Sequence, residues 1–313
     1  MSAVRVEAPA RLHLGMLAVA GDGDRRFGGL GVSIARPAVV LEAQPADELS
    51  VEGAEAERAL TFARRCRDAL GLPGGAHLRV AEAIPPHVGL GSGTKLALAV
   101  AGALAALHGR TDDAPALARA AGRAARSAVG MWSFALGGLV VEGGVRHGVD
   151  PPAPLLMRHA MPDEWRIVLV VPNAEPGLSG AAETQAFERL LPAAGPSAAI
   201  AQLVLTSLLP ALVERDLEEF GSALTRVQRL VGDAFAPVQG GRFHPRAGAL
   251  VEALLRGGAA GAGQSSWGPA VYGVVGSEAA GRDLARRMED LVGGEGVVEV
   301  VAFDNRGARL ERS

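Results

Sequence analysis

The stretch Ile84-Pro-Pro-His-Val-Gly-Leu-Gly-Ser-Gly-Thr-Lys95 stands between two segments of different hydrophobic periodicity. Before it, residues 76–83 partly alternate between apolar and polar, which predicts a β-strand. After it, residues 94–108 are rich in Ala and Leu, which predicts a buried helix. The stretch is therefore expected to connect a strand to the N-terminus of a helix.

Glycine dominates this connection. Because glycine has no side chain, backbone N–H groups can turn towards a ligand, and the helix N-terminus adds its positive dipole end. A purely structural glycine loop is the alternative, but the rigid Pro85-Pro86 pair and the nearby hydroxyls favour a phosphate cradle. Thr94 separates glycine from lysine, so this is not a Walker A loop, and the glycine spacing differs from a dinucleotide fingerprint. The predicted phosphate-binding residues are Gly89, Gly91, Ser92, Gly93, Thr94 and Lys95.

Lys95 is the only lysine in the chain, where every other Lys or Arg position holds arginine. A compositional bias towards arginine explains the scarcity of lysine but not the place of the one that remains. A lysine just inside the helix after a phosphate loop is expected to supply a point charge to phosphate. Replacing Lys95 by alanine should then weaken use of a phosphorylated substrate more than it weakens stability.

Composition sets the class of protein. A chain of 313 residues can form one large or two modest domains. The net charge of −3 argues against binding to nucleic acid or to an anionic membrane. The single cysteine, Cys66, allows no internal disulfide and no cysteine-based metal cluster, which favours a reducing compartment. With no signal-like N-terminus and no long uninterrupted apolar run, a cytoplasmic protein without a membrane span is expected.

The N-terminal region offers two further anion-binding candidates. Residues 4–8 predict a strand that Pro9 ends, and Arg11 and His13 then share one face of an extended segment. They are either a solvated strand face or an anion-facing pair. In the glycine-dense segment 21–31, Arg25 and Arg26 either lie in solvent or bind phosphate.

Helices and a hairpin are expected in the middle of the chain. Residues 56–70 predict an amphipathic helix, and Asp112 or Asp113 caps a second helix over 114–126. On that second helix, the arginines at 119, 123 and 126 would share a face. Residues 132–142 look like a strand, and Gly143-Gly144 predicts a hairpin turn.

The proline-rich segment 150–154 suggests a boundary between an N-terminal domain, 1–150, and a C-terminal domain, 151–313, although one interleaved domain stays open. Residues 164–171 predict a central strand of the second domain. The helix expected over 181–191 begins near Glu183, which either favours the helix dipole or is an active-site carboxylate.

A second glycine loop, residues 257–269, precedes a strand expected over 270–275. Its dense polar set, together with a tryptophan, favours a functional loop over a structural one. The residues concerned are Gln264, Ser265, Ser266 and Trp267. A helix over 278–291 and a strand over 296–303 are expected to complete the chain.

These motifs together resemble the superfamily of galactokinase, homoserine kinase, mevalonate kinase and phosphomevalonate kinase, the GHMP kinases. Pro85–Gly93 resembles its phosphate loop, Ala8–Gly15 its N-terminal motif and Gly261–Gln264 its third motif. A closer resemblance is to one branch, the β-ribofuranosylaminobenzene 5′-phosphate synthases of methanopterin biosynthesis. It rests on Arg11–Gly15, Arg26–Gly29, Pro86–Thr94, Gly177–Gly180 and Gly263–Pro269.

The resemblance implies an α+β fold of two lobes. The N-terminal lobe would resemble ribosomal protein S5 and the C-terminal lobe a ferredoxin-like α/β sandwich. It also implies a decarboxylating phosphoribosyltransferase that joins 5-phosphoribosyl-1-pyrophosphate to 4-aminobenzoate or 4-hydroxybenzoate, with loss of CO₂ and pyrophosphate. Mg²⁺ is expected with the pyrophosphate, with Ser92 and Thr94 as its candidate ligands, and no organic cofactor is required. The expected partners are these small molecules, and a homodimer is left open.

Against that chemistry, His13 and His87 are candidate bases for the para substituent. Arg26 and Glu183 are the other candidate catalytic residues. Arg11 and Arg25 would orient carboxylate or phosphate, and Trp267 would stack on the arene beside Gln264, Ser265 and Ser266.

One departure from the kinases matters. The kinases place a catalytic Asp in a motif after the second helix, whereas residues 127–138 contain no Asp or Glu. This disfavours phosphoryl transfer to a hydroxyl. Two alternatives stay open: an ATP-dependent small-molecule kinase of the same superfamily, and a non-catalytic metabolite-binding protein with the same fold.

Overall fold

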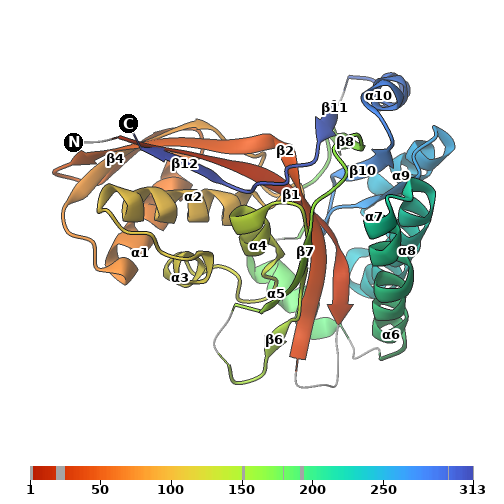
Figure 1. Cartoon of the computed structure of the whole chain (residues 1–313), viewed down its shortest axis with the longest axis horizontal. Coiled ribbons are helices and arrows are strands. Elements are labelled where there is room, and N and C mark those ends of the chain that lie inside the picture. The colour runs from red at the N-terminus through yellow and green to blue at the C-terminus, as the bar shows by residue number, and fades with distance from the viewer. Residues whose placement is uncertain are drawn as a thin grey trace.

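Two β-sheets organise the chain, each with helices packed against it (Figure 1). The computed structural model describes residues 3–18, 25–149, 152–178, 180–190, 194–294 and 296–312. Within them the larger sheet has strand order β12-β1-β2-β4-β3, with β5 and β6 pairing with β2, and β7 with β5. Its strands are β1 (Val4–Ala18), β2 (Arg25–Ala46), β3 (Ser50–Gly53), β4 (Gly75–Glu82), β5 (Leu139–Glu142), β6 (Val145–Arg146), β7 (Leu155–His159) and β12 (Arg309–Arg312).

The helices of the first lobe pack beneath this sheet. Helix α2 is apolar on every side and contacts β1 and β2, so it forms the centre of the lobe. Helix α1 contains buried Ala59, Ala63 and Cys66 and packs on α2. The helices are α1 (Ala56–Leu70), α2 (Ser92–Leu107), α3 (Ala114–Ala120) and α4 (Val129–Leu136).

The smaller sheet has the order β11-β8-β10-β9 and is entirely antiparallel. Alternate residues of β8 enter different cores. Val168 and Val170 pack with α9 and α10, while Ile167 and Leu169 join the main core shared with the first lobe. The strands are β8 (Arg166–Pro172), β9 (Gly261–Gln264), β10 (Val271–Val275) and β11 (Gly296–Ala302). The helices are α5 (Gly180–Arg189), α6 (Ala194–Leu203), the π-helical turn η1 (Val204–Leu208), α7 (Leu209–Glu214), α8 (Leu217–Gln239), α9 (Ala247–Arg256) and α10 (Glu278–Val292).

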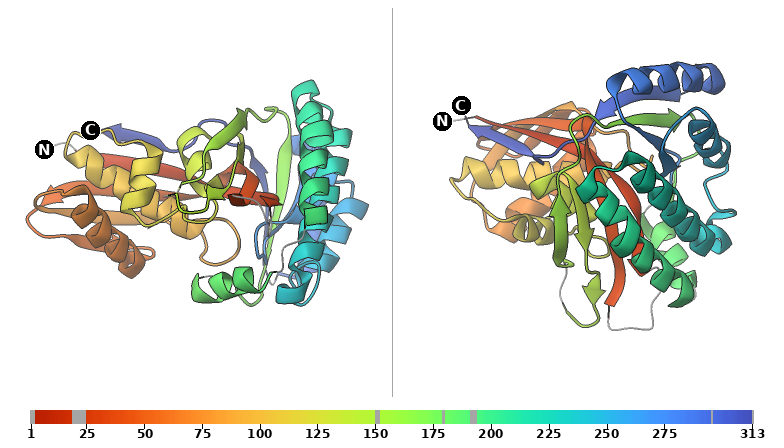
Figure 2. Two further views of the ribbon diagram at one scale, coloured as in Figure 1. Left: turned by 90° about the horizontal axis from the view of Figure 1, so that it is seen from below. Right: turned by 45° about the vertical axis from the view of Figure 1, so that its right-hand side comes forward.

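The expected two-lobed α+β fold is confirmed, but the lobes are not consecutive halves of the chain. Strands β7 and β12, both after residue 150, pair in the first sheet. Both termini therefore lie side by side at the outer end of the first lobe, as Figure 2 shows. Part of the proposed connector, residues 150–151, lies outside the described residues, as do residues 21–24 of the glycine-dense segment 21–31 and Ser179.

Four local predictions were wrong. Pro9 does not end the first strand. Strand β1 continues through it, with a shift in pairing register between Pro9 and Ala10. The second helix ends at Ala120, so the arginines at 119, 123 and 126 do not share a helix face. Residues 132–136, predicted as part of a strand, form the second half of helix α4. Gly143-Gly144 does not join a hairpin, since β6 pairs with β2 instead of β5.

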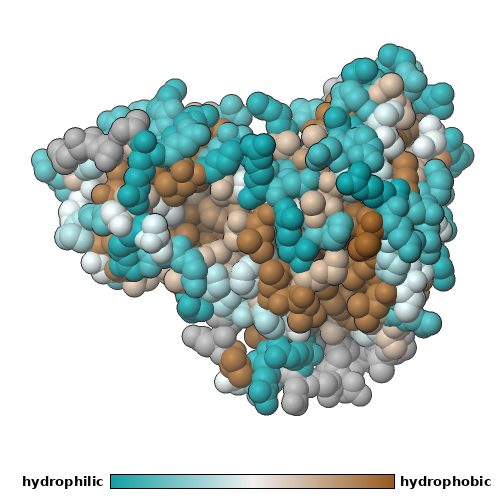
Figure 3. Space-filling view, viewed as in Figure 1, coloured by the Kyte–Doolittle hydropathy of each residue, from teal (hydrophilic) through white to brown (hydrophobic). Residues whose placement is uncertain are grey.

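One helical segment, Pro196–Glu214, is long and apolar enough to cross a membrane by length and composition alone. In the structure it contributes buried residues such as Ile200, Leu208 and Leu212 to the main core. Figure 3 shows apolar residues gathered over the region of β7 and α7. Leu156 of β7, Leu205 of η1 and Val213 of α7 are 62%, 65% and 60% exposed. An exposed apolar face is typical of contact with another macromolecule, and the homodimer stays a prediction.

Candidate active site

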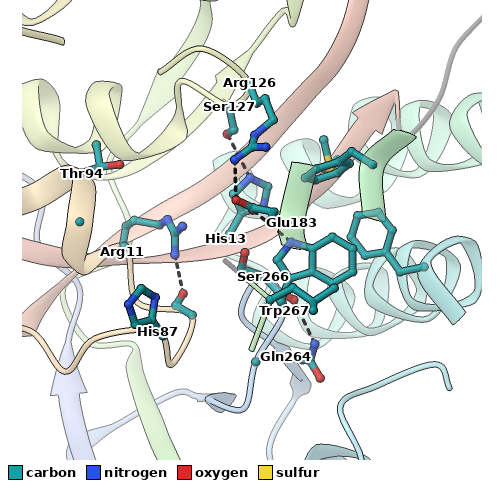
Figure 4. Close-up of a pocket in the computed structure, with 18 of the residues that line it drawn as sticks. Arg11, His13, His87, Thr94, Arg126, Ser127, Glu183, Gln264, Ser266 and Trp267 are labelled. Atoms are coloured by element: carbon teal, nitrogen blue, oxygen red, sulfur yellow. Dashed lines mark hydrogen bonds and ion pairs between the residues drawn. The ribbon is translucent and has the colours of Figure 1, made fainter. Parts of the chain in front are cut away.

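A cavity of about 710 Å³ lies where the glycine loop, β1, α5, α8 and the loop after β9 meet. Figure 4 shows its side chains converging from both lobes. Arg11 and His13 come from β1, His87 from the glycine loop, Glu183 from α5 and Trp267 from the loop after β9. The cavity thus brings together most of the motifs predicted to act together.

The glycine loop holds its shape through contacts that only glycine allows. Gly89 has a φ of +94°, and a Cβ there would overlap the carbonyl oxygen of Ser265. The Ser265 hydroxyl donates to the Gly89 carbonyl at 2.7 Å, and Arg11 donates to the same oxygen. Gly91 is the N-cap of α2 with a φ of +81°. The loop therefore presents the N-terminus of a long buried helix to the cavity.

Three guanidinium groups gather around this helix N-terminus. Arg11 lies against Gly91, and Arg58 and Arg123 both reach Gly93 so closely that a Cβ there would crowd them. Burial lowers the pKa of Arg11 to about 10, and burial together with Arg58 lowers the pKa of Arg123. Both groups stay charged at neutral pH. A site with several crowded cations beside a helix dipole suits a multiply charged anion.

Gly93→Ala should separate anion binding from stability. Gly93 has ordinary helical geometry, so alanine should leave the free energy of unfolding unchanged or raise it by up to about 1 kcal/mol. The new Cβ would displace the Arg58 and Arg123 guanidiniums, and the KM for an anionic substrate should rise about tenfold or more. Urea unfolding and steady-state kinetics measure the two effects. A variant with wild-type KM would contradict the anion subsite.

Aromatic rings form the opposite wall of the cavity. Trp267 stacks on Phe235 with 4.6 Å between ring centroids and an 18° interplanar angle, and Phe187 meets Trp267 edge-on at 5.4 Å. The Trp267 indole N–H donates to Glu183 Oε1 at 3.1 Å. Arg126 pairs with the other Glu183 oxygen at 2.6 Å. Glu183 thus fixes the tryptophan, and the wall offers a flat apolar surface to a planar ligand.

Two histidines line the cavity between these walls. The His13 ring nitrogen Nε2 lies 3.1 Å from the Ser127 hydroxyl. Burial, with Arg11 nearby, lowers the pKa of His13 to about 3, so the imidazole is neutral at physiological pH. His87 has a positive φ of 58°, and its carbonyl accepts from the Gly177 N–H at 3.0 Å. This contact joins the glycine loop to the segment before α5.

The loop after β9 is held by its own polar residues. Gln264 accepts from the His244 N–H at 2.6 Å and donates to the Ser266 carbonyl at 3.0 Å. Ser265 accepts from the His13 N–H at 2.9 Å and does not line the cavity. Gln264, Ser266 and Trp267 do line it. Three of the four predicted residues of this loop thus line the cavity, whereas Ser265 bonds to the backbone of neighbouring segments.

The N- and C-terminal domain descriptions of the GHMP kinases match residues 56–138 and 208–292 of the chain. The beta-ribofuranosylphenol 5′-phosphate synthase of Methanothermobacter thermautotrophicus is 31% identical, with 97% of each chain covered. The chain belongs to the beta-ribofuranosylphenol 5′-phosphate synthase family. The synthase of the same name from Archaeoglobus fulgidus is 30% identical, with 98% of this chain and 99% of the relative covered.

Solved structures of GHMP kinases share the fold of this synthase family member. Homoserine kinase from Cytophaga hutchinsonii superposes with a TM-score of 0.68 at 19% identity, covering 99% of this chain and 97% of the kinase. Mevalonate kinase from L. major gives a TM-score of 0.70 at 15% identity, covering 96% of each. At these identities the likeness concerns the fold alone.

The position of Lys95 contradicts the prediction that this residue binds phosphate. Its side chain is fully buried and does not line the cavity of this synthase family member. The ammonium donates to the Ser133 hydroxyl at 3.0 Å and lies 5.9 Å from the centre of the Phe134 ring. Burial, with Arg11 nearby, lowers its pKa well below the usual value. Helix α2 is buried all round, and Lys95 faces α4 instead of the loop.

Lys95→Met should therefore stabilise the protein by about 1–3 kcal/mol, because it removes a buried ionisable group while keeping its volume. A lowered pKa means that the unfolded state binds more protons below pH 10.5. The advantage of the variant should thus grow as pH falls from about 10 towards the folded-state pKa of Lys95. Denaturant unfolding at several pH values checks this, and substrate KM should change less than twofold.

Arg25 and Arg26 also lie away from the cavity. Arg25 donates to the Gly144 carbonyl at 2.9 Å, and Arg26 lies over the Phe27 ring at 5.4 Å. Neither lines the cavity, so the structure does not support direct contact of Arg25 or Arg26 with substrate. Both lie at the start of β2, where pairing with β6 directs them to the far end of the sheet.

Sequence reasoning missed several residues that line the site: Arg58, Arg123, Arg126, Ser127, Phe187 and Phe235. Arg123 and Arg126 belonged to an arginine repeat that was assigned to a helix face. They reach the cavity because the chain leaves helical geometry after Ala120. Nothing in their local sequence distinguishes the two phenylalanines from core residues.

The expected Mg²⁺ ligands, Ser92 and Thr94, lie among guanidinium groups. The Thr94 hydroxyl accepts hydrogen bonds from Arg123 at 3.2 and 3.4 Å. Arg58 and Arg123 also crowd the first turn of α2. No group of three or more His, Cys, Asp or Glu with metal-binding geometry occurs within the described parts of the chain. Neutral hydroxyls beside guanidinium groups do not fit an ion held mainly by protein ligands.

Proposed function

We propose that this enzyme joins 5-phosphoribosyl-1-pyrophosphate to 4-hydroxybenzoate or 4-aminobenzoate, with loss of pyrophosphate and CO₂, in methanopterin-type biosynthesis. The observation that carries the proposal is the division of one cavity into a cationic half and an aromatic half. The donor is highly anionic and the acceptor is a flat arene, so each half complements one substrate. The family relationship supports the same reaction.

The cationic half would stabilise the departing pyrophosphate. When the bond between ribose C1 and pyrophosphate breaks, negative charge grows on the leaving group and positive charge on the ribose. Arg11, Arg58 and Arg123 stand at the α2 N-terminus, where they would offset the growing negative charge. Groups that are already in position before the reaction give the largest electrostatic stabilisation.

The aromatic half would hold the arene against the ribosyl centre. Trp267 and Phe235 stack on each other, and Glu183 with Arg126 limits rotation of the indole. An arene packed on Phe187 or Trp267 would present its ring carbon at a set angle to ribose C1. Holding the reactants in this geometry replaces a bimolecular encounter by an intramolecular one.

The reaction balances without an oxidant or an organic cofactor. The ring carbon that carries the carboxylate attacks C1 as pyrophosphate leaves, and the para substituent donates electron density. The bond to the carboxyl carbon then breaks, its electron pair restores the aromatic ring, and CO₂ leaves. The name of the relatives contains a ribosylphenol. This favours 4-hydroxybenzoate over 4-aminobenzoate as the arene.

We expect Mg²⁺ to act as a counterion of the pyrophosphate donor, because the donor set of Ser92 and Thr94 does not fit a resident ion. No step of the proposed reaction depends on it. Initial rates with and without added Mg²⁺, at fixed ionic strength, test the expectation.

Purified protein, phosphoribosyl pyrophosphate and carboxyl-labelled 4-hydroxybenzoate or 4-aminobenzoate test the function. Release of labelled CO₂ that requires the donor is expected. No release from either arene would overturn the proposal. ATP consumption with a hydroxylated acceptor would instead support the kinase alternative, and tight binding without turnover would support a metabolite-binding protein.

A further inference from the structure

Glu142 is a buried carboxyl group that the proposed reaction has not yet used. Its side chain is 0% exposed at the end of β5. One oxygen accepts from the Gly144 N–H at 2.8 Å and the other from the Ala128 N–H at 3.3 Å. Burial raises its pKa to about 7, and the bonds from Gly144, Ala128 and Ser127 partly oppose this rise. The group therefore changes its protonation state near neutral pH.

Ser127 connects this carboxyl to the cavity. A serine hydroxyl has one proton to donate and two lone pairs to accept with. The Ser127 oxygen accepts from the Val129 N–H at 3.3 Å, and the adjacent Ala128 N–H donates to Glu142, so Ser127 stands next to the carboxyl group. We assign the Ser127 proton to Glu142, the acceptor whose pKa Ser127 lowers. With this assignment, the Nε2–H of the imidazole donates the contact of 3.1 Å between His13 and Ser127. In that tautomer of His13, Nδ1 is unprotonated and can accept a proton.

The charges around this chain decide where a proton can rest. Arg11 lies close enough to His13 to lower its pKa. Arg126 forms an ion pair with Glu183. Arg25 donates to the carbonyl of Gly144, two residues after Glu142. Arginine stays charged across the working pH range. His13 is buried beside the Arg11 cation, so its doubly protonated, positively charged form is disfavoured. Transfer of a proton from His13 to the Glu142 carboxylate is therefore favourable.

We propose that Glu142, Ser127 and His13 form a proton relay that removes the para-hydroxyl proton of the arene and returns it after decarboxylation. The inference rests on the proposed function. As the arene carbon attacks ribose C1, its hydroxyl proton moves to His13 Nδ1. The Nε2 proton moves to Ser127, and the Ser127 proton moves to Glu142. Loss of CO₂ leaves a phenolate, and the same three transfers run in reverse. His13 and Ser127 end each passage neutral, and Glu142 carries the charge change.

The pH profile is the first test. Because Glu142 must be ionised to accept a proton, kcat with 4-hydroxybenzoate should fall on the acid side with an apparent pKa of about 7. Ser127→Ala should lower kcat by about 100-fold and remove this acid limb, with little change in the KM for phosphoribosyl pyrophosphate. Ser127→Thr keeps the hydroxyl and should restore most of the rate and the acid limb.

A matched control and a second arene make the test specific. Ser50, on the largely exposed strand β3, makes a comparable bond of 3.0 Å to His77 on β4, so Ser50→Ala should leave kcat unchanged. With 3,5-difluoro-4-hydroxybenzoate, whose hydroxyl ionises more readily, the deficit of Ser127→Ala relative to wild type should shrink at least tenfold. An equal deficit for both arenes, or an unchanged pH profile, would overturn the relay. Absence of CO₂ release from the wild-type enzyme would instead overturn the proposed function. Glu142→Gln is the direct variant, and the Ser127 pair gives the answer if Glu142→Gln fails to fold.

Discussion

Replacing Arg123 by alanine should lower kcat/KM for phosphoribosyl pyrophosphate by about 100- to 1,000-fold, the range observed when one preorganised donor to a developing negative charge is removed. Arg123 is directed at the first turn of α2, where it meets the Thr94 hydroxyl and the Gly93 backbone. Arg58 lies close enough to lower its pKa, and an anion bound between the two guanidiniums would offset their repulsion. The cost should therefore appear in donor use and much less in folding.

Arg119→Ala is the matched control for this experiment. Arg119 lies in the preceding helix α3, is exposed and does not line the cavity. The Arg119→Ala substitution removes the same formal charge as Arg123→Ala from a nearby position in the chain. If Arg119→Ala lowered kcat/KM as much as Arg123→Ala, general electrostatic attraction would account for the effect, and the local anion subsite would be wrong. Arg123→Lys should recover part of the rate, because lysine keeps the charge but loses the planar fork.

Gly89→Ala should destabilise the protein by about 3–5 kcal/mol, combining a left-handed backbone with overpacking. The φ of +94° already disfavours a side chain, and the new Cβ would overlap the backbone oxygen of Ser265. Because this oxygen belongs to the loop after β9, relief of the overlap must separate the glycine loop from the aromatic wall. Urea unfolding followed by tryptophan fluorescence measures the loss.

Gly109→Ala isolates the backbone part of that cost. Gly109 also has a positive φ, +70°, but nothing lies within 4 Å of a Cβ built on it. It should cost only about 1 kcal/mol, the strain of a left-handed residue alone. Equal destabilisation by the two substitutions would show that contact between the two loops contributes nothing to stability.

The elements with a strong periodic signal could be predicted from the sequence. The helix over 56–70 and the order strand, glycine loop, helix at the start of α2 match the structure. The failures share one cause, which is that tertiary contacts overrode a local signal. Pro9 stays in a strand because a register shift spares its missing N–H, and residues 132–136 become helical where α4 packs on α2.

Site residues could be predicted where they belong to a recognisable motif. They could not be predicted where the direction in which a side chain points decides whether it reaches the cavity. Arg11, His13 and Trp267 reach the cavity as expected. Lys95 does not, because a helix buried on all sides has no polar face from which its orientation could be read. Glu142 gave no signal, since its importance comes from Ser127, which is fifteen residues away in sequence and adjacent in space.

The pairing of β12 with β1 has a consequence for the order in which the protein can be built. Val4–Glu7 finds its partner Arg309–Arg312 only after about 300 further residues have been synthesised. Until then one edge of the first sheet stays unpaired, although α1 to α4 have long been available to pack on it. During synthesis, domains generally fold from the N-terminus, but this lobe can complete the described sheet only after residues 309–312 have emerged from the ribosome. Strand β12 is thus added to the first sheet after all the other strands of that sheet have been made.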